Sequence, residues 1–344
     1  MLGRIPLKAA DFRGALRTGL HGSAQNGSTD PIHSRRTHFD GGGMSAGTPK
    51  KVIAVVGASG AQGGAVVRAL QGRGIFAIRA LTRRPRDLRL DGAEVVEADL
   101  TRPDSLAGAF RGAHGAFVVT NFWERSPVSE KEQARNAVQA ARDAGVQHLV
   151  WSTLPDVDGI SAGAFHVPHF TGKAEVDADV KAAGFPAYTF VEAPFYFQNL
   201  TTVFAPEPQP GGGKAWVLPL DPNARCLHIG DPADLGKVVA EAFEKPELAG
   251  RGQHLSIASA LVSFAEIAAT LRAQGHDVSF RQVPAEAYAT FPGAEELVAM
   301  FRYWEKFTYF GPDAEAKIAL ARTVAGEPFA DFAGWARRHM PATG

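Results

Sequence analysis

Three glycines follow the apolar run 52–56 at the spacing G-x-x-G-x-x-G: Gly57, Gly60 and Gly63. In such a pattern one glycine allows a tight turn, another lets the backbone approach a pyrophosphate, and the last lets a helix pack closely on the strand. The helix N-terminus that follows would direct unpaired N–H groups at the phosphates. The spacing predicts a dinucleotide-binding turn, with a plain tight turn as the alternative. The other turn residues expected at the ligand are Ser59, Ala61 and Gln62.

The end of the second predicted strand indicates which dinucleotide binds. Sites for NAD(H) usually place an acid there, which accepts hydrogen bonds from the ribose 2′-hydroxyl. This chain has Arg83 and Arg84 instead, and Asp87 is the first acid to follow. Guanidinium groups are well shaped to bind a 2′-phosphate. We therefore predict NADP(H) rather than NAD(H), with a solvated basic turn as the alternative interpretation of the two arginines.

Further candidate contacts follow the third and fourth predicted strands. Ligands of open α/β sheets bind at the carboxyl ends of parallel strands, so residues at these positions face the same site. Asp99 is expected at the adenine end of the dinucleotide. The other candidates at these strand ends are Leu100, Thr120, Asn121 and Phe122.

A parallel sheet is needed to bring these residues together. Apolar, valine-rich runs that do not alternate indicate strands buried on both faces. They lie at 52–56, 77–81, 94–97, 116–119, 149–152 and 188–191. Helices are expected between them, each followed by a glycine, at 61–73, 105–110, 130–144 and 174–183. The alternation predicts an α/β fold with a Rossmann-type, doubly wound parallel sheet over residues 50–192.

The alternation of strands and helices stops after residue 192. A proline- and glycine-rich stretch covers 205–213, a helix is expected over 234–243, and Ser263 and Glu266 are spaced as a capping box at the start of another. Residues 295–338 favour helix, and we interpret their aromatic side chains as core. Residues 193–344 are therefore expected to form a smaller, mostly helical lobe, interwoven with the core, that covers the cofactor and shapes a substrate or partner cleft.

Residues 1–49 differ from the rest of the chain. The first fifty residues hold seven lysines or arginines and three acids, with frequent Ser, Gly and His. This composition, without apolar periodicity, is typical of a disordered leader. An organelle transit peptide is one alternative. A misassigned start is another, in which the working protein begins at Met44, directly after three glycines.

The composition of the whole chain argues against several classes of protein. Lys+Arg and Asp+Glu are both 36, so there is no basic excess to favour nucleic acid or a membrane surface. The single cysteine, Cys226, rules out an intrachain disulfide and fits a cytoplasmic protein. It is either an inert side chain or a redox-sensing thiol.

The sequence patterns of two other kinds of site are incomplete. His166 and His169 are three residues apart, but no third ligand completes a metal site. The order of residues does not fit a serine hydrolase.

Five motifs give the chain a resemblance to a known family. They are Gly57–Gly64, Thr82–Pro85, Val119–Glu124, His169–Lys173 and Pro194–Asn199. From about residue 51 to near its C-terminus the chain resembles the NmrA-like family, an atypical group of the short-chain dehydrogenase/reductase superfamily. In particular, it is similar to the animal NmrA-like NADPH-sensor proteins.

The resemblance implies roles for residues that the glycine pattern does not reach. Enzymes of the superfamily use Tyr-x-x-x-Lys with an upstream serine. Here His169 stands four residues before Lys173, where tyrosine would be, and Ser152 ends the fifth predicted strand. Lys173 is implied to contact the nicotinamide ribose. The residues implied to close over the nicotinamide end are Tyr196, Phe197, Gln198 and Asn199, with Gln198 replacing an acid of the animal proteins and Phe122 replacing a common tyrosine.

The sequence leaves open whether this protein is an enzyme. In one interpretation it reports the NADPH/NADP+ ratio to a regulatory protein partner through loops near 121–127 and 155–168. In another it is an NADPH-dependent oxidoreductase of small carbonyls or quinones, and His169 acts as the general acid. In a third, His169 only forms local hydrogen bonds. A sugar-nucleotide epimerase is disfavoured because the tyrosine is missing, and the family pattern is compatible with a homodimer.

Overall fold

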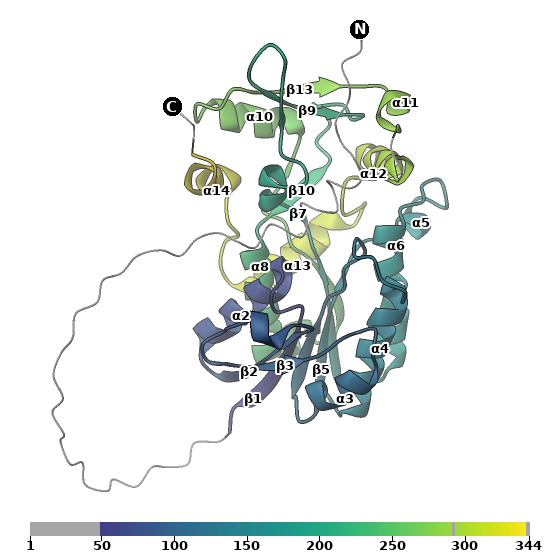
Figure 1. The fold of residues 1–344 in the computed structure, drawn as a ribbon, viewed down its shortest axis with the longest axis vertical. Helices are drawn as coiled ribbons and strands as arrows, with labels where there is room; N and C mark the ends of the chain where they lie inside the picture. Colours follow the sequence, from purple (N-terminus) through teal and green to yellow (C-terminus); the bar gives the residue numbers. More distant parts are fainter. Residues whose placement is uncertain (1–48, 291–292, 342–344) are drawn as a thin grey trace, which may run out of the picture.

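The structure is a computed structural model, and it describes residues 49–290 and 293–341 (Figure 1). Residues 1–48 of the predicted leader, Met44 included, lie outside the described residues. In Figure 1 a twisted sheet flanked by helices forms the lower part of the molecule, and smaller sheets and helices from the second half of the chain lie above it. Within the described ranges, the structure contains no helix that is long and apolar enough to span a membrane.

The lower part is built on a seven-stranded sheet in the order β11-β6-β5-β4-β1-β2-β3. Every neighbouring pair is parallel. Chain order reverses between β1 and β4, which is the position where open α/β sheets bind ligands. The predicted doubly wound fold is therefore confirmed. The strands are β1 (Lys51–Val56), β2 (Phe76–Thr82), β3 (Ala93–Glu97), β4 (Gly115–Val118), β5 (His148–Thr153), β6 (Ala187–Glu192) and β11 (Arg251–Ser256).

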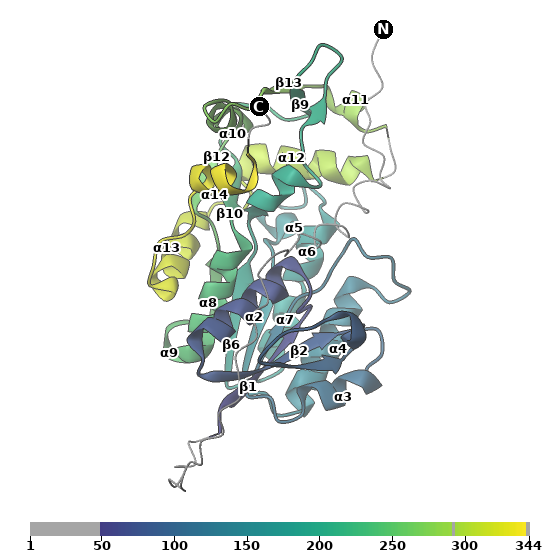
Figure 2. The same cartoon turned by 60° about the vertical axis from the view of Figure 1, so that its left-hand side comes forward.

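Helices cover both faces of this sheet (Figure 2). Because successive strand residues point to opposite faces, Ala54 and Val56 of β1 join one buried cluster, whereas Ile53 and Val55 join another. The first cluster includes α3 (Asp104–Phe110), α4 (Glu130–Asp143) and α7 (Val176–Ala182). The second includes α2 (Ala61–Arg73) and α8 (Pro232–Glu244) and continues into the core of the C-terminal part. The glycine predicted to end α2, Gly74, has a φ of 68°.

One helix beside the predicted site was missing from the sequence prediction. The prediction placed a single helix over 174–183, but the chain forms α6 (Pro168–Ala174) and then α7. Pro168 occupies the first turn of α6, where its missing N–H leaves no hydrogen bond unmade. The short helix α5 (Val157–Ile160) precedes it. The segment that carries His169 and Lys173 is therefore a helix of its own.

The C-terminal part contains two three-stranded sheets that the sequence analysis did not predict. One sheet consists of β7 (Phe195–Tyr196), β10 (Leu227–Gly230) and β12 (Ala260–Val262). The other consists of β8 (Glu207–Pro208), β9 (Lys214–Leu218) and β13 (Val278–Gln282). The helices of this part, besides α8, are α9 (Pro246–Ala249), α10 (Phe264–Arg272), α11 (Ala285–Tyr288), α12 (Ala294–Phe307), α13 (Ala314–Ala325) and α14 (Phe332–His339).

The second half of the chain returns to the first. Strand β11 pairs with β6 and extends the main sheet. Helix α8 packs so closely on α2 that a Cβ added to Gly236 would lie 2.5 Å from the Ala65 carbonyl oxygen. Ser263 and Glu266 form the predicted capping box at the start of α10. Residues after 192 thus supply a strand and a helix to the sheet that carries the glycine turn.

Candidate functional site

The glycine turn lies at the carboxyl end of β1 and leads directly into α2. Gly57 has a φ of 66°, and the Gly60 N–H donates to the Gly57 carbonyl at 2.8 Å. A Cβ on Gly63 would lie only 2.2 Å from the Gly57 oxygen. No side chain caps the first turn of α2, and that turn holds no acid. The turn therefore has the close helix–strand contact and the uncapped helix N-terminus that a pyrophosphate requires.

The two predicted 2′-phosphate ligands have different partners. Arg83 Nη1 donates to Glu124 Oε1 at 2.6 Å, and Arg83 remains 54% exposed. Arg84 is 82% exposed, and its Nε lies 3.6 Å from Asp87 Oδ2. Both arginines directly follow β2, which neighbours β1 in the sheet. Both arginines thus start from the strand end beside the glycine turn, and Arg83 is paired with the segment that follows β4.

Asp99 and Leu100 follow β3, and both are held by local contacts. Asp99 Oδ1 accepts hydrogen bonds from the Thr101 N–H at 2.9 Å and from its hydroxyl at 2.7 Å. Burial acts to raise the pKa of Asp99, but these bonds and the charges of Arg102 and Arg83 outweigh it, so that the pKa lies below its usual value. The Leu100 carbonyl accepts from Asn136 Nδ2 at 2.9 Å. Asp99 is therefore a charged acceptor at this edge of the sheet.

Lys173 lies in a buried cluster of oxygen atoms. Its Nζ donates to the Thr120 carbonyl at 3.0 Å, to the Thr120 hydroxyl at 2.9 Å and to Glu130 Oε1 at 2.5 Å. Only 10% of each charged side chain is exposed. Trp151 Nε1 donates to the Lys173 carbonyl at 3.3 Å and fixes the end of α6 against β5. The lysine implied to hold the ribose is thus placed beside the end of β4 by α4 and α6.

His169 is held by an acid that the sequence analysis did not identify. Its Nδ1 lies 2.5 Å from Glu296 Oε1, and its backbone N–H donates to the same atom at 3.3 Å. Burial acts to raise the pKa of Glu296, but the hydrogen bonds and charge of His169 lower it below its usual value. The ring centroids of Phe122 and Trp123 lie 5.7 and 5.0 Å from that of His169. Glu296 is 127 residues away in α12, so no local motif could reveal it.

The three tentative catalytic residues bond to three separate partners. Ser152 donates to Gln62 Oε1 at 2.6 Å, which connects the end of β5 to the first turn of α2. Lys173 pairs with Glu130, and His169 pairs with Glu296. Ser152 and Gln62 lie on the α2 side of the sheet, where the predicted cofactor turn is. The contacts of the three residues do not link them into one hydrogen-bonded set.

The segment after β4 contributes turn and aromatic contacts. Asn121 Oδ1 accepts from the Trp123 N–H at 3.1 Å, and the Asn121 carbonyl accepts from the Glu124 N–H at 3.4 Å. The rings of Phe122 and Trp123 contact edge to face at 5.1 Å. The two hydrogen bonds form a compact turn that presents Glu124 toward Arg83.

The four residues from Tyr196 to Asn199 have different environments. The Tyr196 hydroxyl is buried without a hydrogen-bond partner, and burial raises its pKa well above the usual value. Phe197 is fully buried, with its ring 5.4 Å from that of Trp335. Gln198 Nε2 donates to Asp231 Oδ2 at 3.1 Å, and the Asn199 carbonyl accepts from the Phe204 N–H at 2.8 Å. Phe197 thus packs in the core, whereas Tyr196 offers an unpaired hydroxyl.

The surroundings of Cys226 and His166, two weaker candidates from the sequence, do not indicate a functional site. Cys226 is buried, and burial raises its pKa to about 12, which favours an inert side chain over a redox-sensing thiol. His166 is mostly exposed, and its Nδ1 lies 3.1 Å from Asp158 Oδ2. Across residues 49–290 and 293–341, no group of three or more His, Cys, Asp or Glu side chains has the arrangement of a metal site.

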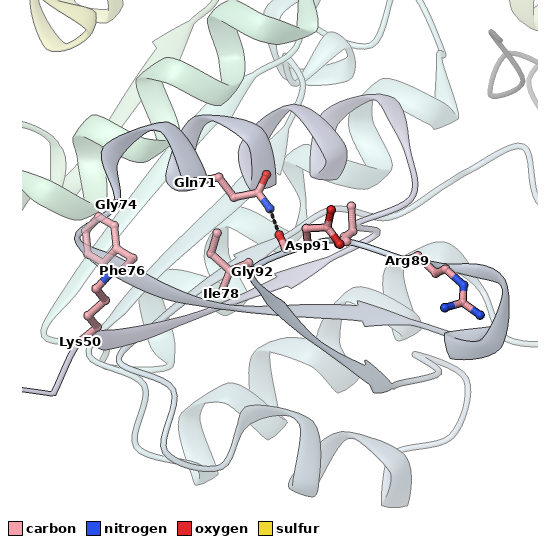
Figure 3. Close-up of a pocket in the computed structure, with 9 residues that line it drawn as sticks. Lys50, Gln71, Gly74, Phe76, Ile78, Arg89, Asp91 and Gly92 are labelled. Carbon is pink, nitrogen blue, oxygen red and sulfur yellow. Dashed lines mark hydrogen bonds between the residues drawn. The ribbon is translucent and has the colours of Figure 1, made fainter. Parts of the chain in front are cut away.

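A hollow of about 520 Å³ lies at the other end of α2 from the glycine turn. It is lined by Lys50, Gln71, Phe76 and Arg89, among others. Figure 3 shows Gln71 of α2 reaching toward the loop before β3, where its Nε2 donates to the Asp91 carbonyl at 2.6 Å. Because it lies at the amino end of β2, the hollow is remote from the strand ends that carry the candidate site.

Known proteins share the sequence pattern. A sequence model of the NmrA-like family matches residues 49–335. The chain is 31% identical over 309 residues to the NmrA-like family domain-containing oxidoreductase FrzB of Cladobotryum sp, which covers 80% of this chain and 91% of that protein. It is 27% identical over 298 residues to an NmrA-like family domain-containing protein of Dictyostelium discoideum, covering 81% of this chain and 96% of that protein.

Solved structures share the fold. The structure of NmrA, a negative transcriptional regulator, superposes on this chain with a TM-score of 0.71 and 25% sequence identity. The match covers 85% of this chain and 96% of the NmrA chain. It has been solved in complex with NAD and with NADP. The NADPH-dependent quinone oxidoreductase QOR2 of Escherichia coli is 20% identical, with a TM-score of 0.67 and coverage of 83% and 99%, and shows a similar fold. The resemblance predicted from the motifs is confirmed, and the chain belongs to the NmrA-like family.

Proposed function

We propose that this chain binds NADP(H) at the glycine turn and acts as a redox sensor that responds to the NADPH/NADP+ ratio. The residues present fit the cofactor. Gly63 allows α2 to pack directly against the Gly57 carbonyl, where a Cβ would clash, the first turn of α2 is uncapped, and two arginines follow β2. The binding of NAD and of NADP by NmrA supports the same assignment.

One observation carries the sensor role. Arg83 and Lys173, the cations proposed to hold the 2′-phosphate and the nicotinamide ribose, are each paired with an acid from one short segment. Glu124 lies in the turn after β4, and Glu130 begins α4. A bound cofactor would compete with both acids for their cations. The position of residues 120–130 would then depend on the ligand, as a signalling segment requires.

The separate partners of Ser152, His169 and Lys173 favour a sensor over an enzyme. In the superfamily pattern the lysine holds the nicotinamide ribose while the neighbouring proton donor reaches the substrate oxygen, so both groups must face the same end of the cofactor. Here Lys173 is bonded to Glu130, and His169 Nδ1 is bonded to Glu296. Cofactor binding would require Lys173 to leave Glu130, whereas proton transfer from His169 would also require His169 to be freed from its own partner or to act through its other ring nitrogen.

The test compares the two oxidation states of the cofactor. Titrations of the full chain with NADPH and with NADP+ should give different dissociation constants, because a ligand of equal affinity cannot shift an equilibrium. Hydrogen exchange over residues 120–130 should differ between the two complexes. Equal affinities and equal exchange would contradict the sensor role, even if both cofactors bind.

The His169–Glu296 pair favours a second candidate function, NADPH-dependent reduction of a small carbonyl or quinone. A carboxylate on Nδ1 fixes the orientation of an imidazole, so that its other nitrogen can face a substrate. Bound NADPH would supply the hydride, and His169 would supply the proton to the substrate oxygen. The names of relatives such as FrzB include oxidoreductase. Turnover of a quinone and aldehyde panel that is lost in both His169→Phe and Glu296→Gln would establish this function over the sensor.

A further inference from the structure

We propose that Glu124 determines the cofactor preference of this site by competing with the 2′-phosphate of NADP(H) for Arg83. The inference rests on the proposed binding of NADP(H) and adds to that site an acid from the segment after β4. In this account Arg83 favours NADP(H) and Glu124 favours NAD(H). The opposing effects of these two residues set the ratio of the affinities for NADP(H) and NAD(H).

The geometry places this pair across the end of the central strand. Arg83 directly follows β2, and Glu124 lies six residues after the end of β4. Strands β2 and β4 flank β1 on its two sides. The 2.6 Å contact between Arg83 Nη1 and Glu124 Oε1 therefore joins segments on either side of the strand that ends in the glycine turn. A dinucleotide bound along the carboxyl ends of these strands would therefore have both residues within its reach.

The backbone that carries Glu124 is held by its own turn. The Glu124 N–H donates to the Asn121 carbonyl, and the Asn121 side chain accepts from the preceding N–H, that of Trp123. Glu124 is less exposed than Arg83, with 25% of its side chain accessible compared with 54%. The acid is thus the more enclosed member of the pair, on a bonded turn, and the more exposed arginine is the member that can turn toward a phosphate.

The two groups prefer different forms of the adenine ribose. A carboxylate accepts hydrogen bonds from a free 2′-hydroxyl, as acids do in NAD sites, and repels a doubly charged phosphate. A guanidinium binds the phosphate through two parallel hydrogen bonds. To bind Arg83 in that way, the 2′-phosphate must displace Glu124 and remain near its charge. Arg84 forms only a looser, exposed ion pair with Asp87, whose oxygen lies 3.6 Å away, so a 2′-phosphate could bind Arg84 without displacing a hydrogen bond.

The test measures the ratio of the dissociation constants of NADH and NADPH, using the full chain and fluorescence titration. Because Glu124→Gln removes the charge and keeps the shape, this ratio should rise about tenfold, through tighter NADPH and weaker NADH binding. In an Arg83→Gln background the same substitution should change the ratio by a clearly smaller factor, since the competition for Arg83 no longer exists and only the direct effect of the carboxylate on the ribose remains. Glu94→Gln is the matched control, because Glu94 accepts from Arg79 at 2.7 Å between β2 and β3, and it should leave the ratio unchanged.

The outcomes separate this inference from the proposed function. If both cofactors bind but Glu124→Gln leaves the ratio within twofold of the parent chain, the inference is overturned and cofactor binding stands. An equal change in the Arg83→Gln background also overturns it, since Glu124 would then act without Arg83. If neither NADPH nor NADH binds the parent chain, the proposed function fails and the inference fails with it.

Discussion

Two buried ionic clusters lie near the carboxyl ends of the main sheet. In the Lys173 cluster, Lys173 contacts Thr120 and Glu130. In the Glu192 cluster, the carboxylate of Glu192 accepts from His254 and Lys317, each at 3.1 Å, and from Ser256, while Asp177 faces the other ring nitrogen of His254 at 3.6 Å. Both clusters bury a carboxylate against a lysine, but they lie at different strands of the sheet.

The difference lies in what each cluster joins. The Lys173 cluster connects α4 and α6 to the end of β4, at the switch point where ligands bind. The Glu192 cluster connects β6 and β11 to α13, away from that point. Glu192 is 1% exposed, and both of its oxygens are bonded. We therefore interpret the first cluster as part of a ligand site and the second as a structural link between the sheet and the C-terminal helices.

Of the substitutions that test this comparison, Glu192→Ala should have the largest effect. The substitution leaves Lys317 and His254 facing a buried site without their carboxylate, so it should lower the free energy of unfolding by about 4 kcal/mol. Chemical denaturation measures this loss. The affinity of the folded protein for NADPH should stay within about twofold of the parent value. Glu315→Ala, an exposed change on the same helix as Lys317, should change stability by less than about 0.5 kcal/mol. A variant of Glu192 that keeps its stability but loses NADPH affinity would reverse the two assignments.

The Lys173 cluster should separate stability from binding. Lys173→Met leaves the buried Glu130 without its cation and should lower the free energy of unfolding by about 3 kcal/mol. Adding Glu130→Gln removes the unpaired charge and should restore most of that loss. Affinity for NADPH should fall about tenfold in the single variant and stay low in the double variant, because the proposed ribose contact is gone. Recovery of binding together with stability would show that Lys173 is structural, like Glu192.

The smallest effect concerns the pH dependence of the Glu192 cluster. Burial raises the pKa of Asp177 to about 7, from a model-compound value of 3.8. The folded state therefore binds this proton more tightly than the unfolded state, so the contribution of Asp177 to stability is complete below about pH 4 and is lost as pH rises through 7. Asp177→Asn should remove this loss and make the variant roughly 2–3 kcal/mol more stable, relative to the parent, at pH 8 than at pH 5. Denaturation curves at pH 5 and pH 8 measure the change in unfolding free energy of each protein. An equal change in the parent and in Asp177→Asn would contradict this prediction.

Local patterns in the sequence predicted most of the core. Helix α2 was predicted over the residues at which it forms, because strand, turn and helix signals coincide around Gly57 and Gly63. Each end of strands β1 to β6 was predicted to within one residue, since strands buried on both faces have continuous apolar sequences. The two small sheets were missed because strands such as β7 and β8 have two residues each, too short to show a period.

The partners of the site residues could not be predicted in the same way. Lys173 and His169 were identified from one motif, but Glu130 lies 43 residues from the lysine and Glu296 lies 127 residues from the histidine. The Glu192 cluster has no motif at all, since its carboxylate meets Lys317 across 125 residues. Such pairs are formed by the tertiary fold, and one sequence contains no periodic or spacing signal for them.

The most direct test of the central claim is cofactor binding at the glycine turn. NADPH and NADH are titrated into the full chain and into two variants of α2, Gly63→Ala and Gly72→Ala. A Cβ at position 63 would lie 2.2 Å from the Gly57 oxygen, whereas a Cβ at position 72 would meet nothing within 4 Å. The account predicts that the parent and Gly72→Ala bind NADPH more tightly than NADH, and that Gly63→Ala binds it at least about tenfold more weakly. Tighter binding of NADH by the parent, or unchanged NADPH binding by Gly63→Ala, would contradict it.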